Sequence, residues 1–282
     1  MGLFDRFKRK KDPEPAAEPP AAPAPGLAPE PDTQAVILLN REIDWTTVSK
    51  AVEGRFGPQA LVSTDTSVPN APAMTFALEG AEFFCGYFAM PHPPQVYDLS
   101  SLPEGLFSPE ERETLLAHKC FLVLAQKGGG TSLAEKRGIC RLFTRLAGAL
   151  MELDGAVGLF LAEAELLVSR RLYLQHAAIL EQNWDDPAYF PAPLWVSIRG
   201  GRKGEAALTG TWGLKQFGFL ELWFLDAKSP WPELHEKLYL MSIYQITGTE
   251  LYKNMDTIAF TPGDPSLFRE LNGALFIVGG GV

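Results

Sequence analysis

Beyond position 33, apolar residues fall into short runs of strand type and longer stretches with a helical period. The run at 35–39, AVILL, is rich in β-branched residues, which favours a buried strand. Val48, Val52 and Phe56 instead recur every four residues, which favours a helix with one buried face. By the same reasoning, strands are predicted at 35–39, 60–64, 120–126, 157–162, 193–200, 206–212, 217–226, 256–260 and 274–278, a hairpin at 74–90 turning near Glu79 and Gly80, and helices near 44–56, 108–116, 132–153, 169–180 and 229–247.

Capping residues stand at the expected starts of these helices. Asp44 precedes the first helix, and Ser132 with Glu135 forms the pattern of a capping box. Strands and helices in this order predict an α+β fold, in which an antiparallel or mixed sheet is flanked by helices. The order is also compatible with two related strand–helix–strand halves, one opening near Ala35 and one near Pro193.

The first 33 residues differ in composition from the rest of the chain. Residues 12–33 are almost entirely Pro, Ala and acidic residues. Proline restricts the backbone and removes a hydrogen-bond donor, and the segment has little apolar surface to offset the entropy of ordering. We therefore divide the chain into a leader at 1–11, a disordered linker at 12–33 and a globular α+β domain at 34–282.

The leader combines apolar and basic residues. Leu3, Phe4 and Phe7 would share one face of a helix, and five basic residues surround them: Arg6, Lys8, Arg9, Lys10 and Lys11. Such a segment can dock peripherally on an anionic membrane or on a partner protein. A soluble, unstructured leader is the other interpretation, because a helix this short is marginal in water.

Charge and cysteine content narrow the functional classes. The net charge is −9, of which the 249 residues after position 33 carry −8. An acidic body disfavours nucleic acid as the main partner, since phosphate contacts dominate that affinity.

The three cysteines, Cys85, Cys120 and Cys140, are too few and too scattered for a disulfide framework, so we expect reduced thiols and a cytoplasmic location, with the leader at most peripheral to the inner membrane face. The most apolar run, at 155–168, contains Glu163 and Glu165, so no transmembrane helix is expected.

No motif predicts a catalytic residue, a metal or a cofactor. The glycine turn at 128–130 lies between a strand and a helix but lacks the Lys-Ser/Thr pair of a phosphate-binding loop, so a plain helix entry is the preferred interpretation. No histidine has a second ligand at convincing metal spacing; the four are His92, His118, His176 and His235. The cysteines lie inside apolar elements, where thiols are inert.

Two groups of charged residues remain as candidates. Arg137, Arg141 and Arg145 lie on one helix face, which is interpreted as solvated, with phosphate or an acidic partner as the alternative. Glu221 lies in a strand whose two faces both look buried, so its carboxylate needs a partner. We expect an ion pair between Glu221 and Arg199 of the preceding long strand, acting as a structural brace more than as catalytic machinery.

The last third of the chain resembles a bacterial family, domain of unknown function family 4261. The resemblance covers roughly residues 190–262 and is carried by Gly213, Gly218 and Glu221 at a strand entry and by the run Asp256-Thr257-Ile258. At the second motif, Met255 and Ala259 stand where glycine is usual. The resemblance implies a bacterial source and a related fold, but no established activity.

Two functions of different classes follow as expectations. The first is a non-enzymatic module that binds an unidentified partner protein, with the leader docking on a membrane or a partner. The second is an enzyme of unrecognised type, with a cleft near Glu221, Asp256 and Arg199. Scattered polar residues favour the first. A deep pocket that converges on Glu221 would favour the second, and a shallow apolar patch the first.

Overall fold

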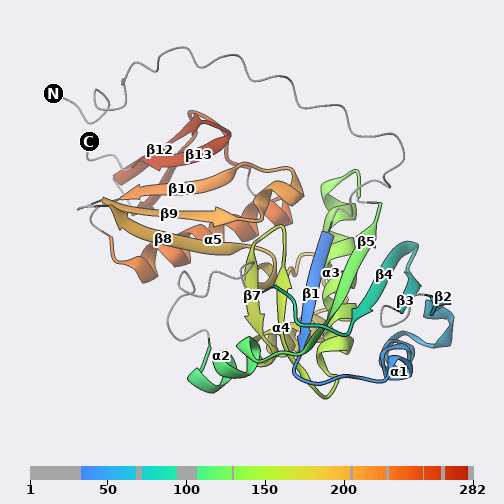
Figure 1. Cartoon of the computed structure of the whole chain (residues 1–282). Helices are drawn as coiled ribbons and strands as arrows, with labels where there is room; N and C mark the ends of the chain where they lie inside the picture. The colour runs from blue at the N-terminus through green and yellow to red at the C-terminus, as the bar shows by residue number, and fades with distance from the viewer. Residues whose placement is uncertain are drawn as a thin grey trace, which may run out of the picture. The chain divides into compact units, whose positions relative to one another are not determined.

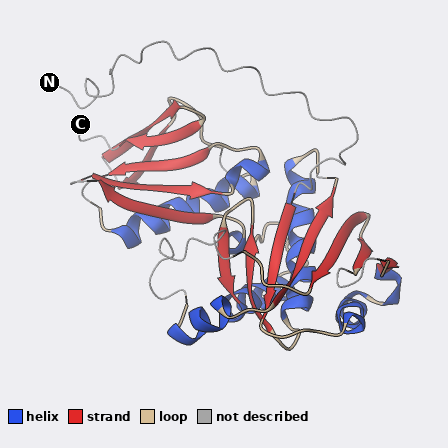
Figure 2. Cartoon of the chain, viewed as in Figure 1, coloured by secondary structure: helices blue, strands red, loops and turns tan. Residues whose placement is uncertain are grey.

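The structure is a computed structural model that describes residues 33–67, 72–93, 107–128, 130–203, 206–226, 229–249, 251–261 and 264–278. Over these ranges the chain is an α+β protein, as predicted, and its strands form two sheets where one was expected (Figures 1 and 2). The leader at 1–11 and residues 12–32 of the linker lie outside the described residues. Within the described residues, no helix is both long and apolar enough to cross a bilayer.

The first sheet has seven strands in the order β2-β3-β4-β5-β1-β6-β7, and every neighbouring pair is antiparallel. Its strands are β1 (Thr33–Leu39), β2 (Leu61–Asp65), β3 (Ala73–Leu78), β4 (Ala81–Phe88), β5 (Cys120–Lys127), β6 (Ala156–Leu161) and β7 (Leu166–Ser169). The predicted turn at Glu79 and Gly80 joins β3 to β4 with φ of 48° and 85°. Positive φ at both positions is the mark of a type I′ hairpin turn, so this prediction is confirmed.

Strand β1 lies inside this sheet and is buried on both faces. Ile37 belongs to the main core, and its neighbour Leu38 belongs to a second, smaller cluster that includes Leu115. Because successive strand residues point to opposite faces, an unbroken apolar run is what such a strand requires. This explains why the run at 35–39 shows no alternation.

Helices cover both faces unequally. α1 (Trp45–Phe56), α3 (Leu133–Met151) and α4 (Arg170–Gln182) pack together on the main core, while α2 (Pro109–Leu116) contacts β6. The predicted capping residues act as expected: the Asp44 carboxylate accepts the N–H of Thr46, and Ser132 and Glu135 form the reciprocal capping box. Each satisfies backbone donors that a helix start leaves open.

The second sheet has six strands in the order β11-β12-β13-β10-β9-β8. They are β8 (Ser197–Lys203), β9 (Ala206–Trp212), β10 (Glu221–Asp226), β11 (Thr257–Thr261), β12 (Asp264–Leu271) and β13 (Ala274–Val278), and only β10 and β13 pair in parallel. Helix α5 (Trp231–Thr247) packs along β8 and β9. The two sheets therefore differ in order and pairing, and they do not repeat one strand–helix–strand unit.

One hydrophobic core continues from the first sheet into the second. Trp195, 1% exposed, lies edge-on to Phe143 of α3, with ring centres 5.6 Å apart. Its indole N–H donates to the hydroxyl of Thr144 at 3.0 Å. The hydroxyl gives the buried N–H a partner, so the large ring is retained without an unsatisfied donor.

The sequence misassigned part of the second sheet. Residues 217–226 were predicted as one strand, but the chain forms a short 3-10 helix, Leu214–Phe217, before β10 begins at Glu221. Gly213 and Gly218 flank that helix with φ of 114° and 87°, conformations that turn the chain out of a strand. The strand predicted from 193 begins only at Ser197, and β7 and β12 were not predicted.

Candidate functional site

Glu221 is held by the loop that precedes it. Its carboxylate accepts the hydroxyl of Thr211 at 2.8 Å, the N–H of Gly213 at 3.0 Å and the N–H of Lys215 at 3.2 Å. The residue is 8% exposed. Three donors satisfy a buried carboxylate without a cation, so Glu221 closes the turn at the strand entry.

The expected ion pair between Glu221 and Arg199 is wrong. Arg199 instead pairs with Glu165, with a nitrogen–oxygen distance of 2.8 Å, and its guanidinium lies 5.3 Å from the ring centre of Trp212. Strand register explains the error. Arg199 is opposite Gly210, and Gly210 is opposite Trp223, so Arg199 is out of register with Glu221. The brace that Arg199 forms joins β8 to the turn before β7.

Asp256 and Thr257 lie elsewhere, at the start of β11. The Asp256 carboxylate accepts the N–H of Lys253 at 2.8 Å. Asp256 and Thr257 line a depression formed within residues 251–259. Neither Asp256 nor Glu221 lines the cavity that contains Arg199. The structure therefore does not assemble these candidates into one cleft.

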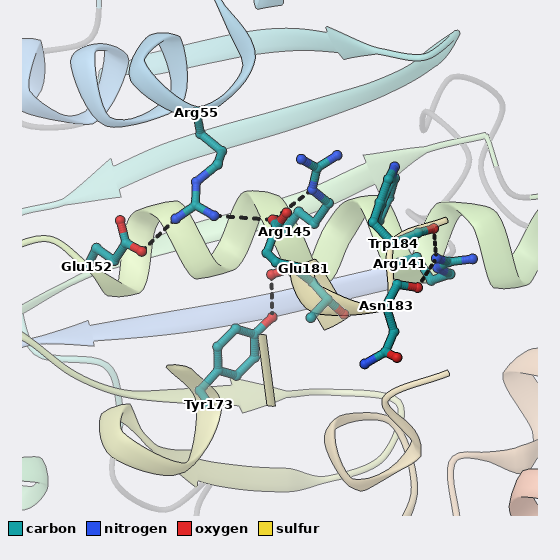
Figure 3. Close-up of polar contacts among 9 residues, drawn as sticks. Arg55, Arg141, Arg145, Glu152, Tyr173, Glu181, Asn183 and Trp184 are labelled. Atoms are coloured by element: carbon teal, nitrogen blue, oxygen red, sulfur yellow. Dashed lines mark hydrogen bonds and ion pairs between the residues drawn. The ribbon is translucent and has the colours of Figure 1, made fainter. Parts of the chain in front are cut away.

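The arginine row on α3 is buried at Arg141 and half-buried at Arg137 and Arg145, so its interpretation as a solvated face is wrong. Figure 3 shows the contacts of Arg141 and Arg145. Arg141 is 9% exposed and donates to the carbonyls of Asn183 and Trp184. Arg137 donates to the carbonyls of Pro187 and Thr247. These bonds tie the segment after α4 and the end of α5 to α3.

Arg145 extends this row into a charged cluster. Its Nε donates to Glu181 at 2.8 Å, and its guanidinium lies 4.1 Å from the ring centre of Trp184. Arg55 of α1 bridges Glu181 and Glu152, as Figure 3 shows. The arginines are thus engaged by carboxylates, carbonyls and rings of the same chain, which assigns them to joining α1, α3 and α4 and not to phosphate.

The glycine turn before α3 is closed by a side chain of the helix itself. One oxygen of Glu135 accepts the N–H groups of Thr131 and Ser132 at 2.8 and 3.1 Å, and the hydroxyl of Thr131 at 2.7 Å. These hydrogen bonds, the Thr131 hydroxyl first, lower the pKa of Glu135. A carboxylate therefore occupies the place where a phosphate would bind, as the plain helix-entry interpretation predicts.

The cysteines are free and buried, as expected. Burial raises the pKa of Cys85 to about 12 and also raises the pKa of Cys120 and Cys140, so all three thiols are protonated at neutral pH. Among the described residues, no group of three or more His, Cys, Asp or Glu side chains could hold a metal ion.

Sequence reasoning missed the face of the second sheet that lies opposite α5, here called the open face. Trp212, Trp223 and Phe276 form a row on it, with ring centres 4.8 and 6.4 Å apart. Around them are exposed or half-buried aliphatic residues: Leu208, Leu225, Leu267, Leu271, Ala274 and Val278. Both faces of β10 had been expected to be buried. The apolar character of this face could have been recognised, because β10 and β13 carry apolar residues on both alternating faces, and a sheet face in contact with water normally carries polar residues.

A second feature that the sequence did not reveal is a cavity of about 490 Å³ between the β7–α4 region and the β8–α5 region. Two of the four histidines, His176 and His235, line it, together with Ser197, Glu165 and Glu236. The histidines were expected to be scattered. Their positions on different helices, far apart in sequence, left no spacing signal.

Comparisons with known proteins add no relative. No family model matches the chain, and no curated protein and no solved structure is significantly similar to it. Its function is therefore inferred from the geometry of its own residues.

Proposed function

We propose that this chain is a cytoplasmic, non-enzymatic module that binds an apolar, acidic segment of a partner protein on the open face. The observation that carries the proposal is the row of Trp212, Trp223 and Phe276, three aromatic side chains that are only half-buried. Antiparallel sheets with one face in water normally carry polar residues there. A contiguous apolar patch on such a face is typical of an interaction site.

Strand register gives this face a charge pattern. Arg199, Gly210, Trp223, Phe276 and Arg269 are successive cross-strand neighbours on β8, β9, β10, β13 and β12. At about 4.8 Å between strands, the two arginines at the ends of this row are roughly 19 Å apart. The row is therefore aromatic in the middle and has an arginine at each end.

The charges at its ends decide which partner fits. Arg199 already pairs with Glu165, whereas Arg269 is exposed and has no ion pair among the described residues. A segment with large apolar side chains and a carboxylate would cover the rings and pair with Arg269. The basic leader of the same chain would bring like charge to Arg269, so it is not the occupant that this face favours.

Gly210 supports a binding role for Trp223 because it leaves room for the indole ring. A Cβ at position 210 would lie 2.5 Å from the nearest indole atom. The ring therefore lies flat over the strand and is positioned before any partner arrives. Rigid aromatic anchors of this kind carry much of the energy of protein interfaces.

The test is selection of peptides on the immobilised full-length protein from a random 12-residue display library. We expect enrichment of aromatic or leucine residues together with Asp or Glu. Binding of the selected peptide should weaken at least ten-fold in Trp223→Ala and in Arg269→Glu. Changing the peptide's acidic residue to Lys should restore binding to Arg269→Glu. Leu116→Ala, at an exposed leucine of α2, should bind like the native chain.

Several outcomes would overturn the proposal. Selected peptides could be basic, or they could bind Trp223→Ala and Arg269→Glu unchanged. Removal of residues 1–33 could strengthen peptide binding ten-fold, which would identify the leader as the occupant. Concentration-dependent dimerisation that Trp223→Ala abolishes would identify a second copy of the chain. Arg269 is exposed, so its variant tests the face even if Trp223→Ala fails to fold.

For the leader we propose peripheral docking on anionic membrane, on the sequence argument alone. The expected result is co-sedimentation of the full chain, but not of a chain lacking residues 1–33, with phosphatidylserine-containing vesicles at low salt. Equal recovery of both chains contradicts it.

The resemblance of residues 190–262 to domain of unknown function family 4261 likewise stays a proposal. The sheet itself runs on to β13, beyond that segment.

The enzyme alternative loses the arrangement on which it depended. Glu221 is bonded within its own turn, and Asp256 lines a separate depression. No observation in the described residues assigns these two side chains to a common reaction.

A further inference from the structure

The cavity introduced above lies where the edge strands of the two sheets approach each other. β7 is the last strand of the first sheet, and β8 is an edge of the second. α4 and α5 supply the remaining walls, and these elements can be followed in Figure 1. The lining is mostly aliphatic: Leu166, Leu167, Val168, Leu172, Leu194, Val196 and Ile198. A volume of about 490 Å³ is within the range of small-molecule sites.

Three polar groups in this lining have no hydrogen-bond partner among the described residues. The hydroxyl of Ser197 is buried on β8 and unpaired. His176 on α4 and His235 on α5 are both half-buried, and no hydrogen bond within the described chain engages their rings. The Ser197 oxygen is almost fully covered, so it reaches a ligand in the cavity by rotating about χ1. A buried hydroxyl without a partner is unfavourable, which favours that rotation when an acceptor or donor is present.

The electrostatics of the cavity disfavour a charged ligand. Burial lowers the pKa of His176 and of His235, so both rings are neutral at pH 7. The guanidinium of Arg199 is neutralised by Glu165, and Glu236 brings a carboxylate to the lining. The Glu236 carboxylate repels anions, and an ion of either sign would lose its hydration among the aliphatic side chains.

We propose that this cavity binds an uncharged, mainly apolar small molecule that carries one hydroxyl or carbonyl group. The Ser197 hydroxyl is its hydrogen-bond partner, and the aliphatic walls bind the apolar part. A hydroxyl suits this role because it can donate to a carbonyl or accept from an alcohol. This site shares Arg199 with the row on the open face, but the variants that test the two proposals lie at other residues, so the two proposals can fail independently.

The probes are 1-decanol, decanoate and decylammonium, which share one chain and differ in the head group. Each competes with the uncharged fluorophore N-phenyl-1-naphthylamine on the full-length protein at pH 7.5. We expect 1-decanol to displace the fluorophore at least ten-fold more effectively than either ion. Ser197→Ala should weaken 1-decanol by about three- to ten-fold, the equivalent of one neutral hydrogen bond.

A matched pair of substitutions separates the cavity from other apolar surface. Leu172→Trp places bulk in the cavity lining and should weaken 1-decanol at least ten-fold. Leu240→Trp makes the same change at an exposed position of α5 outside the lining and should have no effect. Trp223→Ala, on the open face, should also leave 1-decanol binding unchanged.

Four results would overturn the inference. One is decanoate competing as well as 1-decanol, and another is no displacement up to the solubility limit. The third is 1-decanol binding that Ser197→Ala and Leu172→Trp leave intact, and the fourth is 1-decanol binding that Trp223→Ala abolishes. Thermal melting of each variant shows whether it folds. Ser197→Ala removes a single oxygen, so it decides the matter if Leu172→Trp does not fold.

Discussion

The backbone N–H of Gly213 donates a hydrogen bond to the carboxylate of Glu221 at 3.0 Å, so the glycine that bends the chain and the residue that begins β10 are directly joined. Glu221→Ala would leave this N–H, the N–H of Lys215 and the hydroxyl of Thr211 without their acceptor. At roughly 1–3 kcal/mol for each buried unsatisfied group, we expect a loss of about 3 kcal/mol or more in the free energy of unfolding.

Urea unfolding followed by tryptophan fluorescence measures this loss. Glu113→Ala, at an exposed glutamate of α2, is the control and should change the free energy of unfolding by less than about 0.5 kcal/mol. A loss below about 1 kcal/mol for Glu221→Ala would show that the three hydrogen bonds are not needed for stability.

The two glycines of the same turn provide a matched comparison. Gly213 and Gly218 both have positive φ, but a Cβ at 213 would lie 2.3 Å from the carbonyl oxygen of Trp195, whereas one at 218 has nothing within 4 Å. Gly218→Ala should lower stability by about 1–2 kcal/mol through backbone strain alone. Gly213→Ala should lower it by a further 1–3 kcal/mol or so, because the backbone must move. Equal losses in chemical denaturation would contradict the assigned clash.

Arg145 should not be replaceable by lysine. Its guanidinium donates to Glu181 while stacking on Trp184, and a lysine cannot do both. We expect Arg145→Lys to lower the unfolding free energy by about 1–2 kcal/mol. Arg171→Lys, at the more exposed pair with Glu111, should change it by less than about 0.5 kcal/mol. If both variants melt at the native temperature, the cluster contributes nothing measurable.

Stability should fall with acidity in two separate steps. Burial lowers the pKa of His92, His176 and His235 in the folded state, so the unfolded chain binds more protons once the pH falls below about 6.5. Stability is then fully present above pH 6.5 and decreases as the pH falls toward the lowered folded values. The carboxyl groups of Asp44 and Glu135, whose pKa is lowered by hydrogen bonds, add a second loss below about pH 4.

Melting temperatures between pH 8 and 3 measure both steps. A variant with His176→Gln and His235→Gln should lose much of the first step and keep the second. A first step of native size in that variant would show that burial of these two rings does not cause it.

Met255 occupies a left-handed conformation, with φ of 73°, which glycine adopts without strain. Its side chain is 57% exposed and its sulfur accepts a hydrogen bond from Arg269, so truncation loses that contact and little packing. Met255→Gly should therefore stabilise the protein by about 1 kcal/mol by relieving backbone strain. Met90 is equally exposed and has no positive φ, so Met90→Gly should destabilise by about 0.5–1 kcal/mol. Calorimetry of the pair checks both signs.

Local sequence signals predicted the elements whose cause is local. The Asp44 cap, the capping box of Ser132 with Glu135 and the turn at Glu79 and Gly80 each depend on residues within a few positions of one another. Strand β7 was not predicted because four residues are too few to establish a period. The turn before β10 was predicted as part of a strand because the sequence alone does not show that Gly213 and Gly218 adopt positive φ.

The candidate site shows the opposite dependence. A buried carboxylate at position 221 required partners, and that requirement was readable from the apolar residues around it. The sequence did not show which groups donate hydrogen bonds to this carboxylate. Two of the donors are N–H groups of a turn that forms only because its glycines adopt positive φ. Arg199 likewise required an acid, and strand register gave it Glu165.

By itself, the amino-acid sequence determined an α+β domain, the starts and stops of most helices, and cysteines too buried to react, because these follow from periodicity, caps and apolar content. The tertiary structure alone decided which side chains meet. The row across Arg199, Trp223 and Arg269 depends on pairing between strands far apart in the chain, and the cavity with Ser197, His176 and His235 depends on how two sheet edges pack. Long-range pairing is set by the burial of the whole core, which no short window of sequence contains.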